Sequence, residues 1–343
     1  MNVLDTMLDG SYEGLHLFTD KKSGLKALIA LHNTRLGPGL GGTRALATYA
    51  SEEAAITDVL RLSRGMSYKA ALAGLRFGGG KAVIMLPKGP FDREKLFEAF
   101  GRAVDSLGGR YITTEDSGTS PTDIEWVHRF TKHAVGLPAT SGDPSPVTAF
   151  GVVRGIEATA KHLFGSDNLE GKRVNVLGVG NVGFALVGEL ARRGAKVFVS
   201  DINEKAVAAA VSEFKAVALS ENELLSNEAD FYAPCALGAG LNDATIPQLK
   251  VKAITGAANN QLAEARHGEV LAERGIVYVP DYAINAGGLI NVAQEVEGYD
   301  RQKAFDRASK IYDTILELLT RAKASGKRPE QIADLMVEEK IHG

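Results

Sequence analysis

The amino-acid sequence predicts an α/β protein of two domains, the second built on a doubly wound parallel sheet. Three observations support this prediction. The chain has 343 residues, 45% of them hydrophobic, and is too long for one typical core. Over residues 172–280, short apolar runs alternate with helical patterns, as in parallel sheets. A segment rich in Pro, Gly, Ser and Thr begins near residue 136, where it is expected to connect the domains.

The first domain is expected to mix strands and helices. Two strands are predicted at 14–20 and 26–32, followed by a glycine-rich loop at 37–42. Ser51 can cap a helix whose apolar residues recur at helical spacing, and 67–73 continues as helix or turn. The remaining predicted elements are a buried strand at 82–86, a helix at 93–107, a strand at 110–114 and a helix at 121–132.

The second domain is expected to carry the parallel sheet. A helix is predicted at 149–162, and helical pattern resumes beyond residue 281. The predicted strands lie at 173–177, 196–200, 230–234, 252–255 and 276–280, with a weaker candidate at 216–219. The domains are therefore placed at 1–137 and 138–325, and the helices of 326–343 are expected to pack back on the first domain.

Composition argues against several classes of function. The net charge is −3, so no strong positive field is available to hold nucleic acid or an anionic membrane. One cysteine and no Lys or Arg in the first ten residues favour a cytoplasmic protein without a signal peptide. The histidines show no spacing of the H-x-x-x-H kind, so no metal is predicted.

A glycine motif marks a dinucleotide site. Gly178, Gly180 and Gly183 match G-x-G-x-x-G, with Asn181 and Val182 between them, after one predicted strand and before a helix. The glycines permit a tight turn, approach of a pyrophosphate and close packing of helix on strand. The helix N-terminus offers N–H groups to the phosphates.

Asp201 ends the next predicted strand, 23 positions after the first glycine of the motif. A carboxylate there accepts hydrogen bonds from ribose hydroxyls and repels a 2′-phosphate, so NAD is the expected cofactor. The simpler alternative is a structural glycine turn followed by a helix-capping Asp.

Three ionisable residues in the first domain are candidates for chemistry. Lys81 follows three glycines, so its ammonium is expected in a cleft, where burial or another cation such as Lys69 would lower its pKa. General-base work near neutral pH needs that shift. Asp116 follows a strand, a common place for catalytic groups. The ordinary alternatives are solvated surface lysines and a turn-forming Asp.

These residues and their surroundings resemble the glutamate/leucine/phenylalanine/valine dehydrogenase family, most closely its leucine dehydrogenase branch. The resemblance covers nearly the whole chain, and its GGGK, EDxGT and NAGG elements are specific in combination. The matching stretches are LGPGLGGTR (36–44), residues 51–84, RYITTEDSGT (110–119), GDPSPVTAFGVVRG (142–155), GVGNVG (178–183), APCALGAGLND (233–243), GAANNQL (256–262) and YAINAGGLINVA (282–293).

The resemblance implies an enzyme that uses NAD to deaminate an apolar L-amino acid oxidatively and reversibly, giving a 2-oxo acid and ammonia. It implies an N-terminal domain for substrate binding and oligomerisation, a Rossmann domain, a cleft between them, and a homo-oligomer, either dimer or octamer. Lys81 would be the acid/base that activates water, and Asp116 would relay protons. Lys69, with the backbone of Gly41 and Gly42, would bind the substrate carboxylate.

The resemblance also assigns residues around the cofactor. Thr148 would touch the nicotinamide carboxamide, and Asn285 would line the cleft with Gly287 and Gly288. Asn259 and Asn260 would contact nicotinamide and substrate, and the choice between them stays open. Cys235 and Ala236 border the nucleotide site, where Cys235 is interpreted as a small buried residue instead of a nucleophile.

By resemblance, Leu40, Thr114, Leu289 and Val292 line the side-chain pocket. A glutamate carboxylate would be buried there unpaired, at a cost of several kcal/mol. Thr114 and Leu289 are larger than the residues expected in the leucine branch and indicate a reshaped pocket. Leucine, valine and isoleucine are the expected substrates, and an aromatic amino acid remains an alternative because such pockets discriminate weakly.

Two other classes of function compete with this interpretation. A 2-hydroxy-acid dehydrogenase would need a His with a carboxylate partner and a substrate-binding Arg, and no convincing set is found. A non-catalytic amino-acid or nucleotide sensor would be expected to lack the cleft lysines, whereas Lys69 and Lys81 are both present.

Overall fold

The computed structural model describes residues 2–236 and 238–342, which divide into two compact units. The first unit comprises Met1–Asp143, Asn291–Arg301 and Lys340–Gly343, and the second Pro144–Ile290 and Gln302–Glu339. Leu237, within one of the family-like stretches, lies outside the described residues, as do Met1 and Gly343. The α/β class with two domains is confirmed, while the sequence-based boundary at residue 137 stays a prediction.

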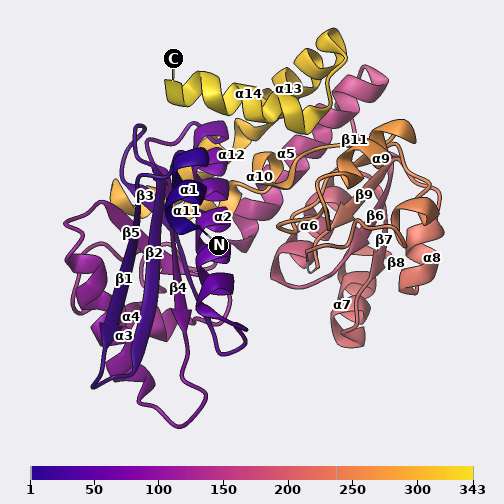
Figure 1. Ribbon diagram of the computed structural model, residues 1–343. Coiled ribbons are helices and arrows are strands. Elements are labelled where there is room, and N and C mark those ends of the chain that lie inside the picture. Colours follow the sequence, from indigo (N-terminus) through magenta and orange to yellow (C-terminus); the bar gives the residue numbers. More distant parts are fainter. Residues whose placement is uncertain (1, 237, 343) are drawn as a thin grey trace. The chain divides into compact units, whose positions relative to one another are not determined.

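The first unit is built on a mixed five-stranded sheet (Figure 1). Its order is β1-β2-β4-β3-β5, with antiparallel pairing among β1, β2 and β4. The strand β3 runs parallel to both β4 and β5 and therefore lies inside the sheet. The strands are β1 (Gly14–Asp20), β2 (Leu25–Asn33), β3 (Gly39–Leu46), β4 (Gly78–Met85) and β5 (Tyr111–Glu115).

Helices cover both faces of this sheet. Along β2, Ile29 packs in a core with α3 (Arg93–Asp105) and α4 (Pro121–His128), whereas Leu28 packs with α2 (Glu52–Leu72). This alternation follows from the two-residue period of a strand. Ser51 caps α2, as expected, by accepting a hydrogen bond from the Ala54 N–H. The short helix α1 (Val3–Asp9) begins the described chain.

The glycine-rich loop expected at 37–42 is wrong, because Gly39–Leu46 form the interior strand β3. Glycine is normally poor in strands, but here neighbouring backbone approaches too closely for a side chain. A Cβ added at Gly41 would lie 2.0 Å from the Gly80 carbonyl oxygen. For a similar reason β4 begins at Gly78 and contains the three glycines that were expected to precede it.

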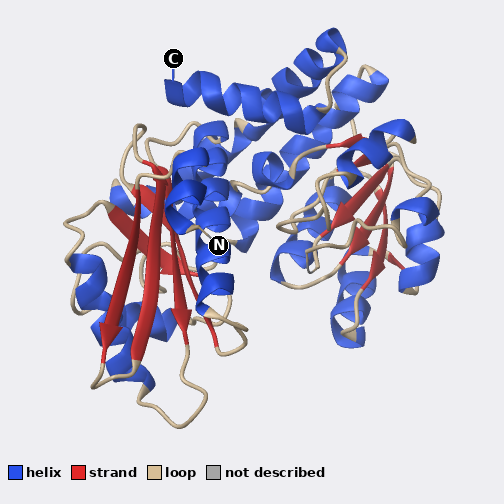
Figure 2. Cartoon of the chain, in the orientation of Figure 1, coloured by secondary structure: helices blue, strands red, loops and turns tan. Residues whose placement is uncertain are grey.

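The second unit contains a six-stranded sheet with parallel pairing throughout, confirming the doubly wound prediction. Figure 2 shows its strands with helices packed around them. The order is β11-β10-β9-β6-β7-β8, so the chain reverses direction of winding at β6. The strands are β6 (Arg173–Leu177), β7 (Lys196–Ser200), β8 (Val217–Ala218), β9 (Phe231–Pro234), β10 (Ala253–Ile254) and β11 (Val277–Tyr278).

The helices from α5 onward lie mostly in the second unit, except that residues 291–301 and 340–342 belong to the first. Among the described helices, none is long and apolar enough to cross a membrane. The helices are α5 (Ser145–Phe164), α6 (Asn181–Arg192), α7 (Glu204–Phe214), α8 (Glu221–Ser226), α9 (His267–Glu273), α10 (Asp281–Ile284), α11 (Gly287–Val296), α12 (Arg301–Ser309), α13 (Ile311–Ser325) and α14 (Pro329–His342), with a 3-10 turn η1 (Ile246–Gln248).

Candidate functional site

The first unit brings Lys81 and Asp116 together. Lys81 lies in β4 with its side chain only 6% exposed, and its Nζ donates a hydrogen bond to Asp116 Oδ2. Because side chains alternate along a strand, Lys81 points to the same face as Val83, which packs with α2. Lys69 lies in the last turn of α2. The two lysines thus belong to elements that pack on one another.

Glycines set the spacing around this ion pair. A Cβ at Gly79 would lie 2.2 Å from Ser67 Oγ on α2, so helix and strand touch two residues before Lys69 and Lys81 respectively. A Cβ at Gly42 would lie 2.8 Å from the Cβ of Asp116. The backbone that sequence analysis assigned to the substrate carboxylate therefore borders the catalytic candidate Asp116.

Asp116 is held as a carboxylate. Burial alone would raise its pKa, but the charge and hydrogen bond of Lys81, the Ser117 N–H and the charge of Arg44 lower the pKa to about 2. Arg44 lies on β3, where its Nη1 binds Asp58 at 2.9 Å. Sequence analysis missed Arg44, although it stands two residues after Gly42 on the strand that carries the site.

Two of the predicted pocket residues, Thr114 and Val292, lie beside the backbone of Gly136. A Cβ at Gly136 would lie 2.4 Å from Thr114 Oγ1 and 3.7 Å from Val292 Cγ1. The Gly136 N–H donates to Glu295 on α11 at 2.9 Å, which holds this backbone in place. Leu40 on β3 is fully buried. Gly136 was not among the predicted residues, and its signal in the sequence is the glycine that opens the expected connection.

In the second unit the glycine motif has the geometry of a phosphate loop. Gly178 follows β6 with φ of +97°, a conformation that disfavours side chains. A Cβ at Gly183 would lie 2.0 Å from the Gly178 carbonyl oxygen, whereas a Cβ at Gly180 would meet nothing within 4 Å. Gly180 is the N-cap of α6, whose first turn contains Asn181 and Val182. The loop therefore leaves room for an anion beside a helix N-terminus.

Cys235 and Ala236 border this loop. A Cβ at Gly178 would lie 2.7 Å from the Ala236 nitrogen, and one at Gly183 would lie 3.3 Å from the Cys235 Cβ. Burial raises the pKa of the Cys235 thiol to about 11. A thiol that keeps its proton is a poor nucleophile. Cys235 is half-buried by its surface exposure, so its interpretation as a buried residue stays a prediction.

Asp201 follows β7 and is oriented by backbone. Its Oδ2 accepts a hydrogen bond from the Val179 N–H at 2.6 Å and its Oδ1 one from the Asn203 N–H at 2.8 Å. The side chain of the next residue, Ile202, is 98% exposed. A carboxylate can accept further bonds, so Asp201 can still bind hydroxyls.

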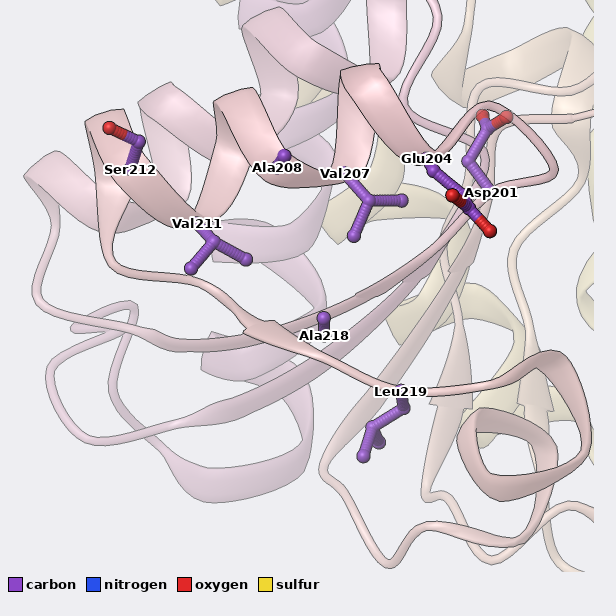
Figure 3. A pocket seen from close by; sticks show the side chains of 8 residues that line it. All are labelled: Asp201, Glu204, Val207, Ala208, Val211, Ser212, Ala218 and Leu219. Carbon is purple, nitrogen blue, oxygen red and sulfur yellow. The ribbon is translucent and has the colours of Figure 1, made fainter.

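A shallow hollow extends from Asp201 along α7 (Figure 3). Figure 3 shows the carboxylates of Asp201 and Glu204 at one end and the side chains of Val207 and Val211 farther along. Its walls also contain Ala208, Ser212, Ala218 and Leu219. This mostly apolar surface was not among the predicted sites; it is lined by α7, by β8 and by the residues Asp201 and Leu219 beside them.

The remaining predicted cofactor residues lie in two places within the second unit. Asn285 is buried and donates to the Ala257 carbonyl oxygen at 3.0 Å and to Asn259 Oδ1 at 2.9 Å. Its own Oδ1 is buried with no hydrogen-bond partner among the described residues. Asn260 has a φ of +52°, and its N–H donates to Asp281 at 2.7 Å. Asn259, Asn260 and Asn285 thus lie in one cluster, and which of Asn259 and Asn260 would contact the substrate stays open.

Thr148 lies on α5 against the glycines that open α11. Its Oγ1 donates to the Pro144 carbonyl oxygen at 3.0 Å. A Cβ at Gly287 would lie 2.6 Å from the Thr148 Cα, and one at Gly288 would lie 3.1 Å from its Oγ1. These glycines are therefore required by the packing on α5. Leu289, the next residue of α11, is buried.

The sequence and structure were compared with those of known proteins. Residues 15–133 match the family described as Glu/Leu/Phe/Val dehydrogenase, dimerisation domain, and residues 199–324 match Glutamate/Leucine/Phenylalanine/Valine dehydrogenase. The leucine dehydrogenase of Bacillus cereus is 54% identical over 96% of this chain and 91% of its own length. The valine dehydrogenase of Streptomyces virginiae is 47% identical over 97% and 94%. The crystal structure of L-tryptophan dehydrogenase from Nostoc punctiforme is 42% identical, with a TM-score of 0.89 and 98% of each chain covered.

Proposed function

The chain belongs to the Glu/Leu/Phe/Val dehydrogenase family, and from this premise we propose that it deaminates branched-chain L-amino acids with NAD. The reaction converts amino acid, NAD and water reversibly into 2-oxo acid, ammonia and NADH. The observation that carries the proposal is the buried ion pair of Lys81 and Asp116, next to the backbone of Gly42.

Lys81 and Asp116 are the proposed proton-handling pair. NAD held by the second unit would supply the acceptor for the hydride that leaves the substrate Cα. Lys81 takes a proton from the water that attacks the resulting imine carbon, and Asp116 passes a proton to the departing amino group. The hydrogen bond from Lys81 to Asp116 supports this assignment, because it joins the two groups between which the proton would pass.

Lys69 and the backbone of Gly41 and Gly42 are proposed to bind the substrate carboxylate. An ammonium and backbone N–H groups suit a carboxylate, since charge-assisted hydrogen bonds are the stronger class. Leu40, Thr114, Leu289 and Val292 are proposed to line the side-chain pocket. Three of these four side chains are aliphatic, which favours leucine, valine or isoleucine over a charged substrate.

The proposal of NAD as cofactor rests on the second unit. The glycine loop leaves space above Gly180, and the carboxylate of Asp201 lies beside that loop through its bond to the Val179 N–H. The exposed Ile202 offers an apolar surface that an adenine ring would cover. The unpartnered Oδ1 of buried Asn285 can accept a hydrogen bond from a carboxamide. Thr148, Asn259, Asn260, Cys235 and Ala236 are proposed to complete this site.

A panel of L-amino acids, followed by NADH absorbance, tests the proposal. We expect leucine, valine and isoleucine to give the highest kcat/KM, glutamate to give no turnover, and NADP to replace NAD poorly. Lys81→Ala should abolish turnover while NAD binds with nearly unchanged affinity. Binding of an amino acid without any turnover in the unaltered protein would instead favour a sensor.

An aromatic substrate is the alternative that one observation favours. The tryptophan dehydrogenase noted above shares 42% of its residues with this chain. The leucine and valine enzymes have higher sequence identities to this chain, 54% and 47%, and these support the branched-chain proposal over the aromatic alternative. A higher kcat/KM for phenylalanine or tryptophan than for leucine in the same panel would reverse the choice.

We also propose a cytoplasmic homo-oligomer that associates through the first unit. The strand β1 is an edge strand, and Leu17 on it is 67% exposed. Leu4 and Leu8, one turn apart on α1, are 77% and 79% exposed. An open edge and exposed leucines favour association with another chain. Sedimentation analysis should give a multiple of the chain mass, and Leu17→Lys should shift it toward smaller species.

A further inference from the structure

We propose that Tyr111 is a positioning residue for the substrate carboxylate. Its buried hydroxyl fixes the peptide between Gly41 and Gly42 so that the Gly42 N–H points toward Lys81. This inference rests on the proposed function, which assigns that peptide to the carboxylate. It adds a residue that touches neither substrate nor cofactor and acts through the backbone alone.

The hydroxyl of Tyr111 is placed by direct contacts. Tyr111 opens β5 and is fully buried in the core shared with α3. Its hydroxyl donates to the Gly41 carbonyl oxygen at 2.7 Å, and it lies 3.3 Å from Thr113 Oγ1 and 3.5 Å from the Gly42 carbonyl oxygen. Thr113 Oγ1 in turn lies 2.6 Å from Thr43 Oγ1. The two threonine hydroxyls therefore lie on one side of the tyrosine hydroxyl, which donates its own proton to the Gly41 carbonyl.

Gly80 on β4 has no side chain, and this leaves room for the Tyr111 ring. Tyr111 begins on β5, and a Cβ at Gly80 on β4 would lie only 2.6 Å from its Cδ2. Since β3 lies between those strands, the ring reaches across β3. A Cβ at Gly39 of β3 would also meet the core, 2.7 Å from Leu31 Cδ2. Gly80 of β4 thus makes room for the aromatic ring, whereas Gly39 of β3 makes room for Leu31 and the backbone of Gly80.

Fixing the Gly41 carbonyl also fixes the Gly42 N–H. The two groups belong to one planar trans peptide and point in opposite directions. The Gly39 N–H donates to the Arg110 carbonyl oxygen beside β5, so odd-numbered residues of β3 direct their backbone groups to β5. The Gly41 carbonyl is bonded by the Tyr111 hydroxyl, so the N–H of the same peptide points away from that hydroxyl.

The pairing of β3 with β4 is interrupted at Gly41 and Gly42. The pairing of β3 with β4 joins Leu40 to Gly79 and then Thr43 to Ala82, and it omits Gly41 and Gly42. Lys81 is the β4 residue that would have stood opposite Gly42 in this register. In the proposed orientation the Gly42 N–H enters this interruption beside the Lys81 ammonium, as binding of a carboxylate requires.

Two consecutive glycines need such an external restraint. Glycine explores more backbone conformations than any other residue, so its peptide is not oriented by its own side chain. Without the tyrosine hydroxyl, the buried Gly41 carbonyl would lose this partner and turn toward another donor. That rotation would carry the Gly42 N–H away from β4.

The test compares two leucine-derived inhibitors on Tyr111→Phe. The first, 4-methylpentanoate, keeps the carboxylate and lacks the amine, and 3-methylbutylamine keeps the amine and lacks the carboxylate. Loss of one hydrogen bond to the peptide should raise KM for leucine and Ki for the carboxylate by about tenfold. The Ki of the amine, the KM of NAD and, within about twofold, kcat should stay unchanged.

Thr113→Val is the matched control. It removes the more distant partner of the tyrosine hydroxyl from the same core but keeps the bond to Gly41, so it should leave both Ki values within about twofold. Equal weakening of both inhibitors in Tyr111→Phe, or of neither, would overturn the inference. If Tyr111→Phe lost its cooperative melting, the tyrosine would be structural and the inference would also fail.

The two levels of proposal fail in different ways. If the unaltered chain turned over no amino acid, the proposed function would fail. If it turned over leucine while Tyr111→Phe bound 4-methylpentanoate as tightly as the unaltered chain, only the role of Tyr111 would fail. The amine inhibitor separates a carboxylate effect from general loosening of the pocket.

Discussion

Gly79 of β4 lies directly against Ser67 of α2, so closely that an added Cβ would be 2.2 Å from the serine Oγ and 2.4 Å from its nitrogen. Gly79→Ala is therefore expected to force strand and helix apart. Overpacking of this kind costs about 1–3 kcal/mol in the free energy of unfolding. Urea denaturation measures this loss, and kcat should fall because Lys81 and Lys69 each follow the contact by two residues.

Gly65 supplies the control for that substitution. It lies on the same helix, and a Cβ there would meet nothing within 4 Å. Gly65→Ala should leave activity unchanged and raise the free energy of unfolding by about 0.5–1 kcal/mol, since glycine weakens helix interiors. Equal effects of the two substitutions would show that the approach of α2 to β4 is not the cause.

Asp116→Asn should reduce kcat by about 100-fold, because it removes the carboxylate that exchanges protons with Lys81. The same pair makes stability depend on pH. The pKa of Asp116 falls from 3.8 to about 2 in the folded chain, so its stabilisation is complete above pH 4 and is lost as the pH falls through 2. The difference in unfolding free energy between the unaltered chain and Asp116→Asn should accordingly shrink from pH 5 to pH 3. A constant difference would contradict the ion pair as its source.

Asp201→Asn should reduce the preference for NAD over NADP by about tenfold or more, since it removes the charge that repels a 2′-phosphate. An asparagine still offers one oxygen to the backbone N–H groups of Val179 and Asn203, so the loop should keep its place. Steady-state kinetics with both cofactors measures the ratio. Glu204→Gln, at the first turn of α7, serves as a control for the loss of a nearby charge.

Thr114→Ala should widen the proposed side-chain pocket, because Thr114 Oγ1 fills the space beside Gly136. The ratio of kcat/KM for phenylalanine to that for leucine is expected to rise by about tenfold, the range that a small change in pocket volume produces. Competition assays with both amino acids measure it. An unchanged ratio would remove Thr114 from the list of specificity residues.

Much of the fold follows from local patterns. The strands at 173–177 and 196–200 match β6 and β7 residue for residue, because apolar runs between turns identify buried parallel strands. The helix capped by Ser51 was equally clear from its capping residue and apolar spacing. By contrast, the loop predicted at 37–42 is wrong, since the glycines of β3 are required by the close backbone of Gly80 and Glu115. Local sequence does not indicate which residues of other strands will lie beside these glycines.

The candidate site shows the same division. The sequence indicated Lys81 and Asp116 through the turns and strands beside them, and the structure places them in contact. The sequence contains no sign of Tyr111, because a tyrosine in a strand is ordinary in isolation, and it marks Gly136 only as the start of a connection. Only the folded chain reveals that Tyr111 reaches across β3 to Gly41.

Because side chains alternate along β4, the direction of Lys81 depends on the exact number of residues in this strand. Val83 packs toward α2 and Ile84 toward α3, and Lys81 faces α2 because it stands two positions from both Val83 and Gly79. Insertion or deletion of a single residue between Gly79 and Lys81 would turn the ammonium into the opposite hydrophobic layer. The length of this segment should therefore tolerate no change of one residue, even where each individual side chain could be exchanged.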